Sequence, residues 1–345
     1  MTRSTFFRTG LRRSLIATAV GATMAATAVS NTAMAQEREL LNSSYDIARE
    51  LFSAINPEFQ AWWQEEHGEE IAISQSHGGS SAQARAIMQG MRADVVTFNQ
   101  VTDVQVLADA GLVAEDWQDA FDNNASPYYS TTAFLVRKDN PKGIESWDDL
   151  AKEGVQIVFP NPKTSGNGRY TYLAAWGFAE NEFDGDEEKI QDFMRTFLRN
   201  VAVFDTGGRG ATTSFIERGI GDVLISFESE VNNIRGEYGS DDYEVIVPPV
   251  SILAEFPVAV VGENAERNGN SDLAQSYLEY LYREDTQRLL AGFNYRVHDE
   301  TVVAEFADQF PDTELLEVED VFGSWEEAME NHFEGGALLD QLQRR

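Results

Sequence analysis

The sequence predicts an α/β protein made of two lobes. Short apolar runs typical of strands alternate along the chain with amphipathic stretches typical of helices, and this alternation favours mostly parallel sheets covered by helices. About 310 residues remain after an amino-terminal leader is set aside, which exceeds the ~250–300 residues at which a single core usually stops growing. We therefore expect two lobes.

The expected elements follow one another in a regular order. Strands are expected, because of their Val, Ile, Leu and Phe content, at 71–74, 94–98, 133–137, 155–159, 201–204, 222–227, 243–247 and 257–261. Helices are expected, because apolar residues recur with helical spacing, at 46–64, 82–90, 104–110, 147–152, 169–178, 187–199, 212–218, 272–283 and 286–293. Ligands of such sheets sit beyond the carboxyl ends of the strands, so the turns there are the first candidates for a site.

The first 35 residues have the pattern of a secretory signal peptide. Basic residues come first: Arg3, Arg8, Arg12 and Arg13. An apolar, small-residue run at 15–29 follows, and Ala33–Ala35 supplies an A-x-A cleavage pattern, so the mature chain is expected to begin near Gln36. A membrane anchor is the alternative, but the run is shorter than ~20 residues and diluted with Ala, Thr and Gly. Whether export uses the twin-arginine route stays open.

The charge of the chain excludes some partners. The formal net charge is -32, and removal of the leader leaves 22 basic and 58 acidic residues, a net of -36. Nucleic acid is excluded as a partner because binding to its backbone needs a basic surface. The absence of cysteine excludes disulfides, thiolate metal sites and cysteine catalysis. Acid enrichment with only five lysines favours adaptation to saline surroundings, the alternative being an ordinary acidic secreted protein.

Three Gly/Ser-rich turns each follow an expected strand and lead into an expected helix. They are Ser76–Ser81, Thr164–Gly168 and Thr206–Gly210. The first N–H groups of a helix have no internal acceptor, and the helix dipole places partial positive charge there, so such turns collect phosphate-like or sulfate-like ligands. In so acidic a chain, they indicate a small anion held by neutral backbone donors.

Each polar residue at these turns also has a simpler interpretation. Ser80 is either a helix cap or an anion donor, and the hydroxyl of Ser165 can donate to a ligand in the same way. Arg169 and Arg209 are candidate anion ligands, although salt bridges at a lobe surface are the commoner role of such residues. His77 could serve a nucleophilic serine as a base, but no G-x-S-x-G elbow surrounds any serine, which favours a local turn residue.

Nine segments carry the most specific signal of the chain: Leu40–Asp46, Gln75–Ser80, Ala93–Thr97, Phe134–Lys138, Pro160–Gly166, Asp205–Gly210, Glu217–Ile225, Ile252–Glu255 and Phe322–Trp325. In sequence and order they resemble the periplasmic sulfate/thiosulfate-binding proteins, which are the ligand receptors of ABC-type importers. The resemblance covers essentially the whole mature chain. Ser226–Asn233 makes it closest to the thiosulfate-binding branch.

The resemblance implies a two-lobed periplasmic binding protein fold of the type II kind, with a ligand cleft between lobes joined by hinge strands. We expect 36–134 and 255–345 to form the first lobe and 135–254 the second, with 133–137 and 252–261 as the crossings. The carboxyl-terminal helices would then rejoin the first lobe.

The resemblance also implies the ligand contacts. They are expected from the N–H of Asp46, the N–H of Ser80, the hydroxyl of Ser165 and the N–H groups of Gly166, Asn167 and Gly208. Sulfate-specific relatives have Gly at position 167, Ala at 208 and Trp where this chain has Phe227, so one indole donor is missing here. The implied function is binding of thiosulfate or sulfate in the periplasm for an ABC permease of the inner membrane.

No catalysis, no cofactor and a monomeric state are expected with this function. Three other functions stay open from the residues alone: a serine hydrolase, a receptor for another ligand class such as polyamines, and a structural surface protein. A hydrolase would need a base within reach of Ser80 or Ser165, and a polyamine receptor would use acids and aromatic residues.

Overall fold

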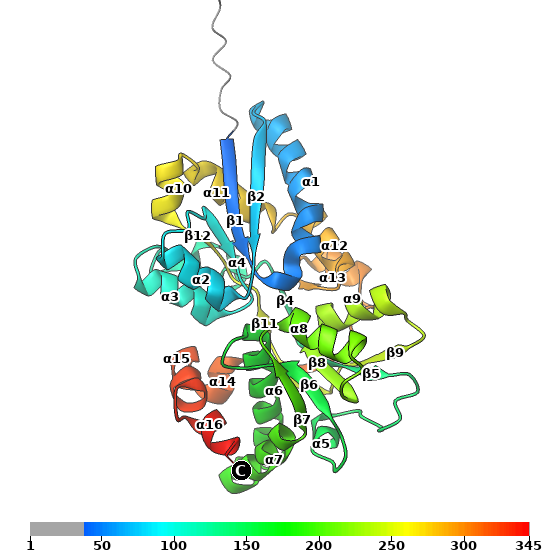
Figure 1. Ribbon diagram of the computed structural model, residues 1–345. Helices are drawn as coiled ribbons and strands as arrows, with labels where there is room; N and C mark the ends of the chain where they lie inside the picture. Colours follow the sequence, from blue (N-terminus) through cyan, green and yellow to red (C-terminus); the bar gives the residue numbers. More distant parts are fainter. Residues whose placement is uncertain (1–37, 345) are drawn as a thin grey trace, which may run out of the picture. The chain divides into compact units, whose positions relative to one another are not determined.

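Two open sheets built from different parts of the chain form the framework of the protein (Figure 1). The structure is a computed structural model that describes residues 38–344, so the expected signal peptide, 1–35, lies outside the described residues. Residues Glu37–Arg345 cluster as one compact unit. None of the helices in 38–344 is long and apolar enough to cross a membrane.

The first sheet holds strands from both ends of the chain. Its strands are β1 (Arg38–Ser44), β2 (Ile71–His77), β3 (Val95–Thr97) and β12 (Val258–Val260). Their order is β12-β3-β1-β2, and β1 runs parallel to both β2 and β3 while β12 is antiparallel to β3. The helical segments that belong to this part are η1 (Asp46–Ala48), α1 (Arg49–His67), α2 (Ser80–Met88), α3 (Val101–Asp109), η2 (Trp117–Ala120), α4 (Asp122–Ala125), α10 (Gly262–Asn268), α11 (Ser271–Tyr280), α12 (Glu284–Gly292) and α13 (Glu300–Glu305).

The second sheet comes from the middle of the chain. Its strands are β5 (Thr132–Arg137), β6 (Ile157–Pro160), β7 (Val201–Asp205), β8 (Val223–Phe227) and β9 (Tyr243–Ile246). In the order β7-β6-β8-β5-β9, β6 is parallel to β7 and β8, whereas β5 is antiparallel to β8 and β9. Its helical segments are α5 (Trp147–Leu150), α6 (Gly166–Glu182), α7 (Glu187–Arg199), α8 (Gly208–Thr212), η3 (Thr213–Glu217) and α9 (Glu228–Tyr238).

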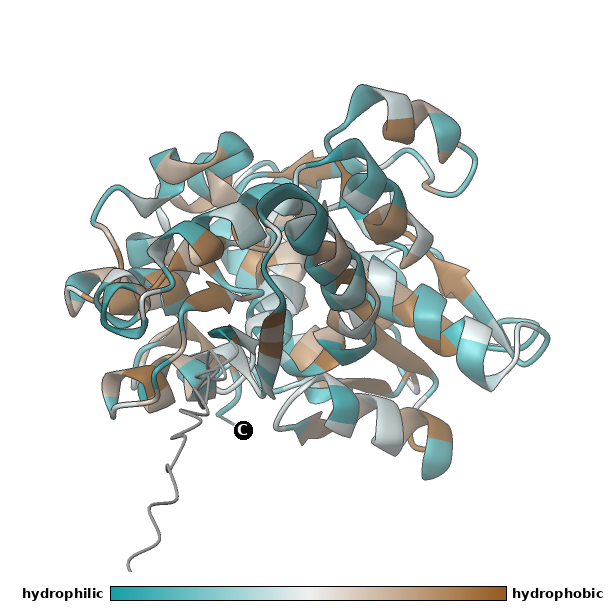
Figure 2. Ribbon diagram, turned by 90° about the horizontal axis from the view of Figure 1, so that it is seen from above, coloured by the Kyte–Doolittle hydropathy of each residue, from teal (hydrophilic) through white to brown (hydrophobic). Residues whose placement is uncertain are grey.

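Alternate residues of the second sheet enter two different cores. On β5, Phe134 and Val136 join the large core that includes α6 and α7, whereas Ala133 and Leu135 join a smaller core beneath α8 and α9. Successive side chains of a strand point to opposite faces, so a sheet covered on both sides needs apolar residues at nearly every position. In Figure 2 hydrophobic residues are frequent on the strands, whereas the helices carry hydrophobic and hydrophilic residues in turn.

The chain passes between the two sheets through adjacent strands. β4 (Tyr128–Ser130) pairs antiparallel with β11 (Ala254–Glu255) and with β13 (Arg296–Val297). Just beyond β4, the Oγ1 of Thr131 donates to the carbonyl oxygen of Ile252 at 2.8 Å. The first crossing therefore lies at β4 and Thr131, slightly before the expected 133–137, and the second lies within the expected 252–261.

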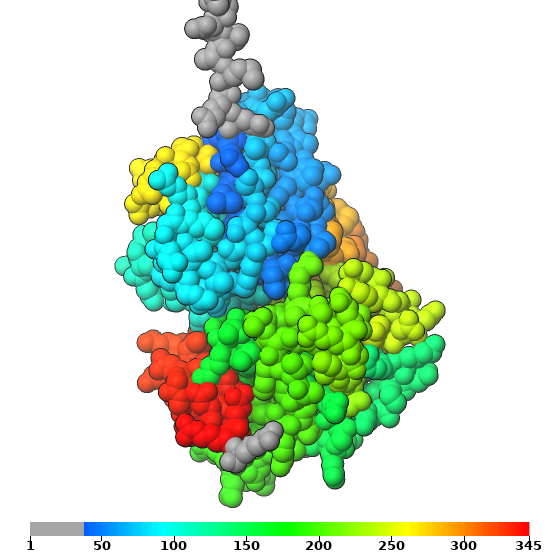
Figure 3. All heavy atoms as spheres, in the orientation of Figure 1, coloured from blue at the N-terminus to red at the C-terminus, as the bar shows by residue number. Residues whose placement is uncertain are grey.

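A third crossing was not expected, and it changes the place of the carboxyl terminus. After β13 the chain forms β14 (Glu314–Leu316), which pairs in parallel with β10 (Val250–Ile252). The last helical segments then follow: α14 (Val318–Phe322), α15 (Trp325–Ala328), η4 (Met329–Phe333) and α16 (Leu338–Leu342). α14 contacts α6 and α16 contacts α7, so this segment (red in Figures 1 and 3) packs mainly on helices of the second sheet.

These contacts differ from the expected division in two places. β5 belongs to the second sheet from Thr132 onwards, and 318–342 pack mainly on α6 and α7, with α15 also in contact with α3 of the first part. The Nζ of Lys163, before α6, donates to the carbonyl oxygen of Phe333 at 2.7 Å and holds the segment there. The expectation of mostly parallel sheets is also only half right, because the strands next to the crossings, β5 and β12, run antiparallel.

The expected elements were most accurate where the pattern is strongest. α7 spans Glu187–Arg199 as expected, since its apolar stripe is clear and Asp186 caps it by accepting from the N–H of Lys189. β1 was missed because Asn42, Ser43 and Ser44 look like a turn. These side chains are buried, and Asn42 accepts from the hydroxyl of Thr97 at 3.1 Å on the neighbouring strand, which a search for apolar runs cannot detect.

Close packing at the start of α6 yields a prediction about stability. A Cβ on Gly168 would collide with the carbonyl oxygen of Pro160 and lie 2.9 Å from backbone atoms of Asn161 and Pro162. We expect Gly168→Ala to lower the free energy of unfolding by about 1–3 kcal/mol, measured by chemical denaturation.

Gly236→Ala is the matched control. Gly236 lies in α9 with no atom within 4 Å of an added Cβ, so alanine there should stabilise the protein by about 0.4–1 kcal/mol. Equal effects of the two substitutions would contradict the packing argument.

Candidate anion-binding site

The start of α6 is shaped by the turn that follows β6. Ser165 caps the helix, and its Oγ accepts from the N–H of Gly168 at 3.4 Å, which leaves the hydroxyl proton free to donate. Gly166 and Asn167, the first residues of the helix, are buried. The turn is closed by Asn161, whose carbonyl oxygen accepts from the N–H groups of Thr164 and Ser165.

The start of α2 lies at the end of β2 in the first sheet. Ser80 is 3% exposed, and its Oγ both donates to Oδ1 of Asn99 at 2.8 Å and accepts from the N–H of Asn99 at 3.2 Å. This pair ties the β2–α2 turn to the segment that follows β3. The Ser80 side chain is therefore held by Asn99, which follows β3. Its backbone N–H has no protein acceptor within the described residues.

The start of α8 lies beside Asp46. A Cβ on Gly207 would lie 3.3 Å from Oδ2 of Asp46, and one on Gly208 would lie 3.4 Å from Cγ2 of Ile47. Burial raises the pKa of Asp46, whereas the backbone N–H groups of Asp46, Ile47 and Arg209 that face its carboxylate lower it. The amino terminus of α8 thus already faces a carboxylate from η1 of the first sheet, as the helix dipole favours.

These turns come together although they belong to different sheets. A Cβ on Gly166 would lie 2.9 Å from Oδ1 of Asn99, one on Gly79 would lie 4.0 Å from the carbonyl oxygen of Thr164, and one on Gly208 would lie 3.9 Å from Nδ2 of Asn167. Glycine is needed at 166 because a side chain there would push the two sheets apart.

Four of the five expected backbone donors are free, whereas the N–H of Asp46 faces its own carboxylate. Within residues 38–344, no protein acceptor is found for the N–H groups of Ser80, Gly166, Asn167 and Gly208. All four stand at helix starts, where the helix itself offers no acceptor. The arrangement can therefore hold a small anion with neutral donors from both sheets.

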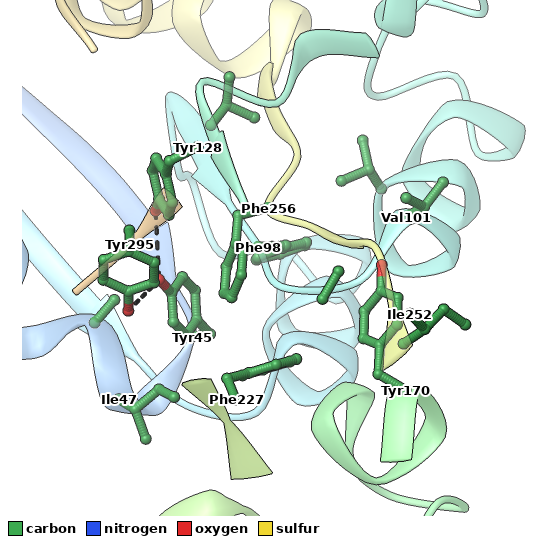
Figure 4. Packing of buried hydrophobic residues seen from close by; sticks show 14 of the residues in the cluster. Tyr45, Ile47, Phe98, Val101, Tyr128, Tyr170, Phe227, Ile252, Phe256 and Tyr295 are labelled. Carbon is green, nitrogen blue, oxygen red and sulfur yellow. Dashed lines mark hydrogen bonds between the residues drawn. The ribbon is translucent and has the colours of Figure 1, made fainter. Parts of the chain in front are cut away.

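Phe227 lies behind this group of donors. It ends β8, next to Ser226, whose Oγ accepts from Nδ2 of Asn167 at 2.7 Å. Its ring is fully buried and packs against Phe256, with centroids 5.1 Å apart, and against Tyr170 at 5.9 Å (Figure 4). The end of β8 thus presents an apolar ring without a hydrogen-bond donor.

Three buried tyrosines support Asp46 from behind, and the sequence pattern did not indicate them. The hydroxyl of Tyr45 donates to that of Tyr295 at 2.9 Å and lies 3.4 Å from that of Tyr128 (Figure 4). Burial raises the pKa of all three phenols, so they stay neutral at physiological pH. They tie the end of β1 to β4 and to the segment before β13, residues more than 80 positions apart.

The two candidate arginines pair with acids instead of pointing freely into the site. Arg169 on α6 is buried, with Nη1 3.9 Å from Oδ1 of Asp103 on α3 and Nη2 3.5 Å from Oγ of Ser81. Arg209 on α8 is exposed, and its Nη2 lies 2.9 Å from Oε1 of Glu50 on α1. Both pairs join the two sheets on either side of the donor turns, which supports the salt-bridge interpretation.

The arrangement does not fit a serine hydrolase at Ser80. The Nδ1 of His77 lies 3.2 Å from the carbonyl oxygen of Tyr45, and the hydroxyl of Ser80 donates to Asn99. Burial lowers the pKa of His77. Within the described residues, no group of three or more His, Cys, Asp and Glu side chains could hold a metal ion.

An acidic cavity of about 340 Å³ is lined by Arg209 and by Ile47, the residue after Asp46. Its lining includes Glu50, Glu217, Glu230 and Glu237, with Arg209 as the cation among them. Burial, together with the negative charge of Asp46, raises the pKa of Glu230 to about 8. This carboxyl therefore changes its charge close to physiological pH, beside the proposed donors.

Comparison with known proteins identifies close relatives. The profile of the family "Bacterial extracellular solute-binding protein" matches residues 47–296. The thiosulfate-binding protein of Escherichia coli (strain K12) is 57% identical over 309 residues, covering 89% of this chain and 91% of the relative. The sulfate-binding protein of the same strain is 44% identical over 322 residues, covering 93% and 97%.

Solved structures agree in fold. The sulfate-binding protein SubI from Mycobacterium tuberculosis H37Rv matches with a TM-score of 0.77 and 30% identity, covering 86% of this chain and 100% of that one. A periplasmic thiamin binding protein matches with a TM-score of 0.65 and 18% identity, covering 90% and 97%, which shows the fold alone. The expected α/β periplasmic binding protein fold is confirmed, and the chain belongs to the bacterial extracellular solute-binding proteins, in the group of the thiosulfate-binding and sulfate-binding proteins.

Proposed function

We propose that this protein is a periplasmic receptor that binds thiosulfate or sulfate and delivers it to an ABC-type permease for sulfur uptake. Relatives over nearly the full chain are a thiosulfate-binding and a sulfate-binding protein. The observation that carries the proposal is the set of backbone N–H groups without acceptors, contributed by helix starts of both sheets next to the hydroxyl of Ser165. The leader at 1–35 supports export to the periplasm.

The donor set suits a fully ionised oxyanion. N–H and O–H groups can donate to the oxygens of a fully ionised anion, whereas hydrogen phosphate brings a proton that needs an acceptor. The carboxylate of Asp46, next to the start of α8, already faces three backbone N–H groups. The proton would therefore stay unpaired, which disfavours phosphate.

Phe227 favours thiosulfate over sulfate. Thiosulfate carries one larger, softer sulfur that accepts hydrogen bonds poorly. An apolar ring beside this sulfur therefore costs little binding free energy. A sulfate oxygen at the same place would lack a donor. The high identity with a thiosulfate-binding protein supports the same preference.

Calorimetric titration of the mature protein tests the function. We expect one site per chain for thiosulfate and for sulfate, and no binding of phosphate or spermidine at neutral pH. Phosphate binding of similar strength would contradict selection by donors alone, and spermidine binding would favour a receptor for cations.

Ser165→Ala is the matched variant for this titration. It removes a hydroxyl expected to donate to a charged ligand, which corresponds to a loss of affinity of roughly 10- to 150-fold. Its melting temperature should stay near that of the unaltered protein, since the lost cap bond to Gly168 is long. An unchanged affinity would show that Ser165 only caps α6.

Phe227→Trp should shift selectivity towards sulfate. The indole N–H restores a donor, and we expect the affinity for sulfate to rise relative to thiosulfate by up to ~10-fold in competition titrations. The larger ring enters a filled core, so a loss of stability of about 1–3 kcal/mol is expected as well. A folded variant with an unchanged ratio of the two affinities would remove Phe227 from the site.

Anion affinity should fall as the pH rises from 7 to 9. The pKa of Glu230 is raised to about 8. A bound dianion nearby favours the protonated form of Glu230 and raises this pKa further. Above pH 8 the protein therefore takes up a proton when it binds the anion, and a higher pH opposes binding. We expect a decrease of up to ~10-fold, the equivalent of a one-unit change of pKa on binding.

Two glutamine variants test this pH dependence. Glu230→Gln should bind with the low-pH affinity throughout, whereas Glu237→Gln removes a charge from the same cavity lining and should keep the dependence. The same decrease in Glu230→Gln as in the unaltered protein would assign the effect to another group.

A further inference from the structure

Gln100 is a fully buried side chain whose amide has no hydrogen-bond partner. It precedes α3, directly after β3, and is 0% exposed. Within 38–344, neither its Nε2 nor its Oε1 has a partner. Buried amides are seldom left unpaired, because the group has lost its water without gaining a substitute.

Gln100 lies next to the start of α6, and the residue before it contacts the start of α2. A Cβ on Gly166, at the start of α6, would lie 3.0 Å from Cβ of Gln100. The preceding residue, Asn99, exchanges two hydrogen bonds with Ser80 at the start of α2. Gln100 therefore belongs to the contact at which donor turns of the two sheets meet.

A second set of unpaired atoms lies one helical turn further along the same contact. Arg169 follows Gly166 by three residues on α6, and Asp103 follows Gln100 by three residues at the start of α3. Arg169 and Asp103 approach each other to 3.9 Å, yet the Nε and Nη1 of Arg169 have no hydrogen-bond acceptor within the described residues. The first turns of α3 and α6 thus face each other, with an unpaired amide and a partly unpaired guanidinium between them.

We propose that the side-chain amide of Gln100 is a ligand-recognition group, which donates from Nε2 to the bound anion and accepts at Oε1 from the guanidinium of Arg169. The inference rests on the proposed anion-binding function and adds a side-chain donor from the first sheet to it. Only the NH₂ end of an amide can face a dianion, because the carbonyl oxygen would repel it. With the NH₂ end on the anion, the oxygen is free for a cationic donor.

This assignment accounts for both sets of unpaired atoms at once. Both Nε2 and Oε1 of Gln100 then have a hydrogen-bond partner, and Arg169 gains an acceptor besides Asp103. The amide of Gln100 then lies between the guanidinium of Arg169 and the anion, and Arg169 keeps its contact with Asp103. A turn without glycine, at the end of β3, thereby joins the three Gly/Ser-rich turns.

Gln100→Met tests the proposal, with Gln287→Met as the matched control. Methionine has nearly the shape of glutamine but no hydrogen-bonding amide. Gln287 is equally buried, but its Nε2 donates to the carbonyl oxygens of Pro127 and Leu281 at 2.7 Å, and its Oε1 accepts from the N–H of His298 at 3.0 Å.

The two variants should behave in opposite ways. Gln100→Met should lower thiosulfate affinity about 10- to 150-fold, as expected for one hydrogen bond to a charged group, and keep the melting temperature of the anion-free protein. Gln287→Met should lower that melting temperature and keep the affinity, because it leaves three backbone groups unpaired, none of which belongs to a proposed donor turn. Gln100→Glu, which replaces the NH₂ by a negative oxygen, should lose more affinity than Gln100→Met.

The outcomes separate the proposal from the function on which it rests. If the unaltered protein binds neither thiosulfate nor sulfate, the proposed function fails. If it binds and Gln100→Met binds equally well, the role of Gln100 is overturned. Should Gln100→Met be less stable, the rise in melting temperature with saturating thiosulfate still reports ligand coupling, and a rise equal to that of the unaltered protein also overturns the role.

Discussion

Backbone N–H groups without acceptors are the constraint on which the rest of this structure depends. A helix start leaves them unpaired, and a fold that buries several helix starts must supply acceptors from outside the helices. Here the starts of α2, α6 and α8 and the short helix η1 all follow strands, at the carboxyl ends where α/β proteins bind their ligands. The anion proposed as the ligand would satisfy them together.

The architecture brings these helix starts together. β1 and β2 place Asp46 and Ser80, and β6 and β7 place Ser165 and Gly208. The crossing strands β4 and β11 hold the two sheets next to each other, and glycine at 166 allows the final approach to Asn99. Apart from the hydroxyl of Ser165 and the proposed amide of Gln100, each contribution is a main-chain feature, so the site depends strongly on where the strands end.

A strongly acidic chain can hold an anion in this way because the donors are neutral. Its two arginines near the donors are each paired with an acid of the opposite sheet, Arg169 with Asp103 and Arg209 with Glu50. These cations hold the sheets together while their charge is compensated. Three further acids, Glu217, Glu230 and Glu237, line the neighbouring cavity, where burial raises the pKa of Glu230 to about 8.

The sequence by itself determined the α/β class, most helices and the donor turns, because helix periodicity and the glycine needed at tight turns are local properties. It identified the turns of Ser80, Ser165 and Gly208, but it missed β1, whose polar residues pair with other strands.

Tertiary structure alone decided what joins distant segments. The three tyrosines behind Asp46, the pairing of the arginines, the third crossing and the position of Gln100 all rest on contacts between residues far apart in the chain. A local pattern cannot encode such contacts, since each side chain acquires its role only from the partner that the fold places beside it.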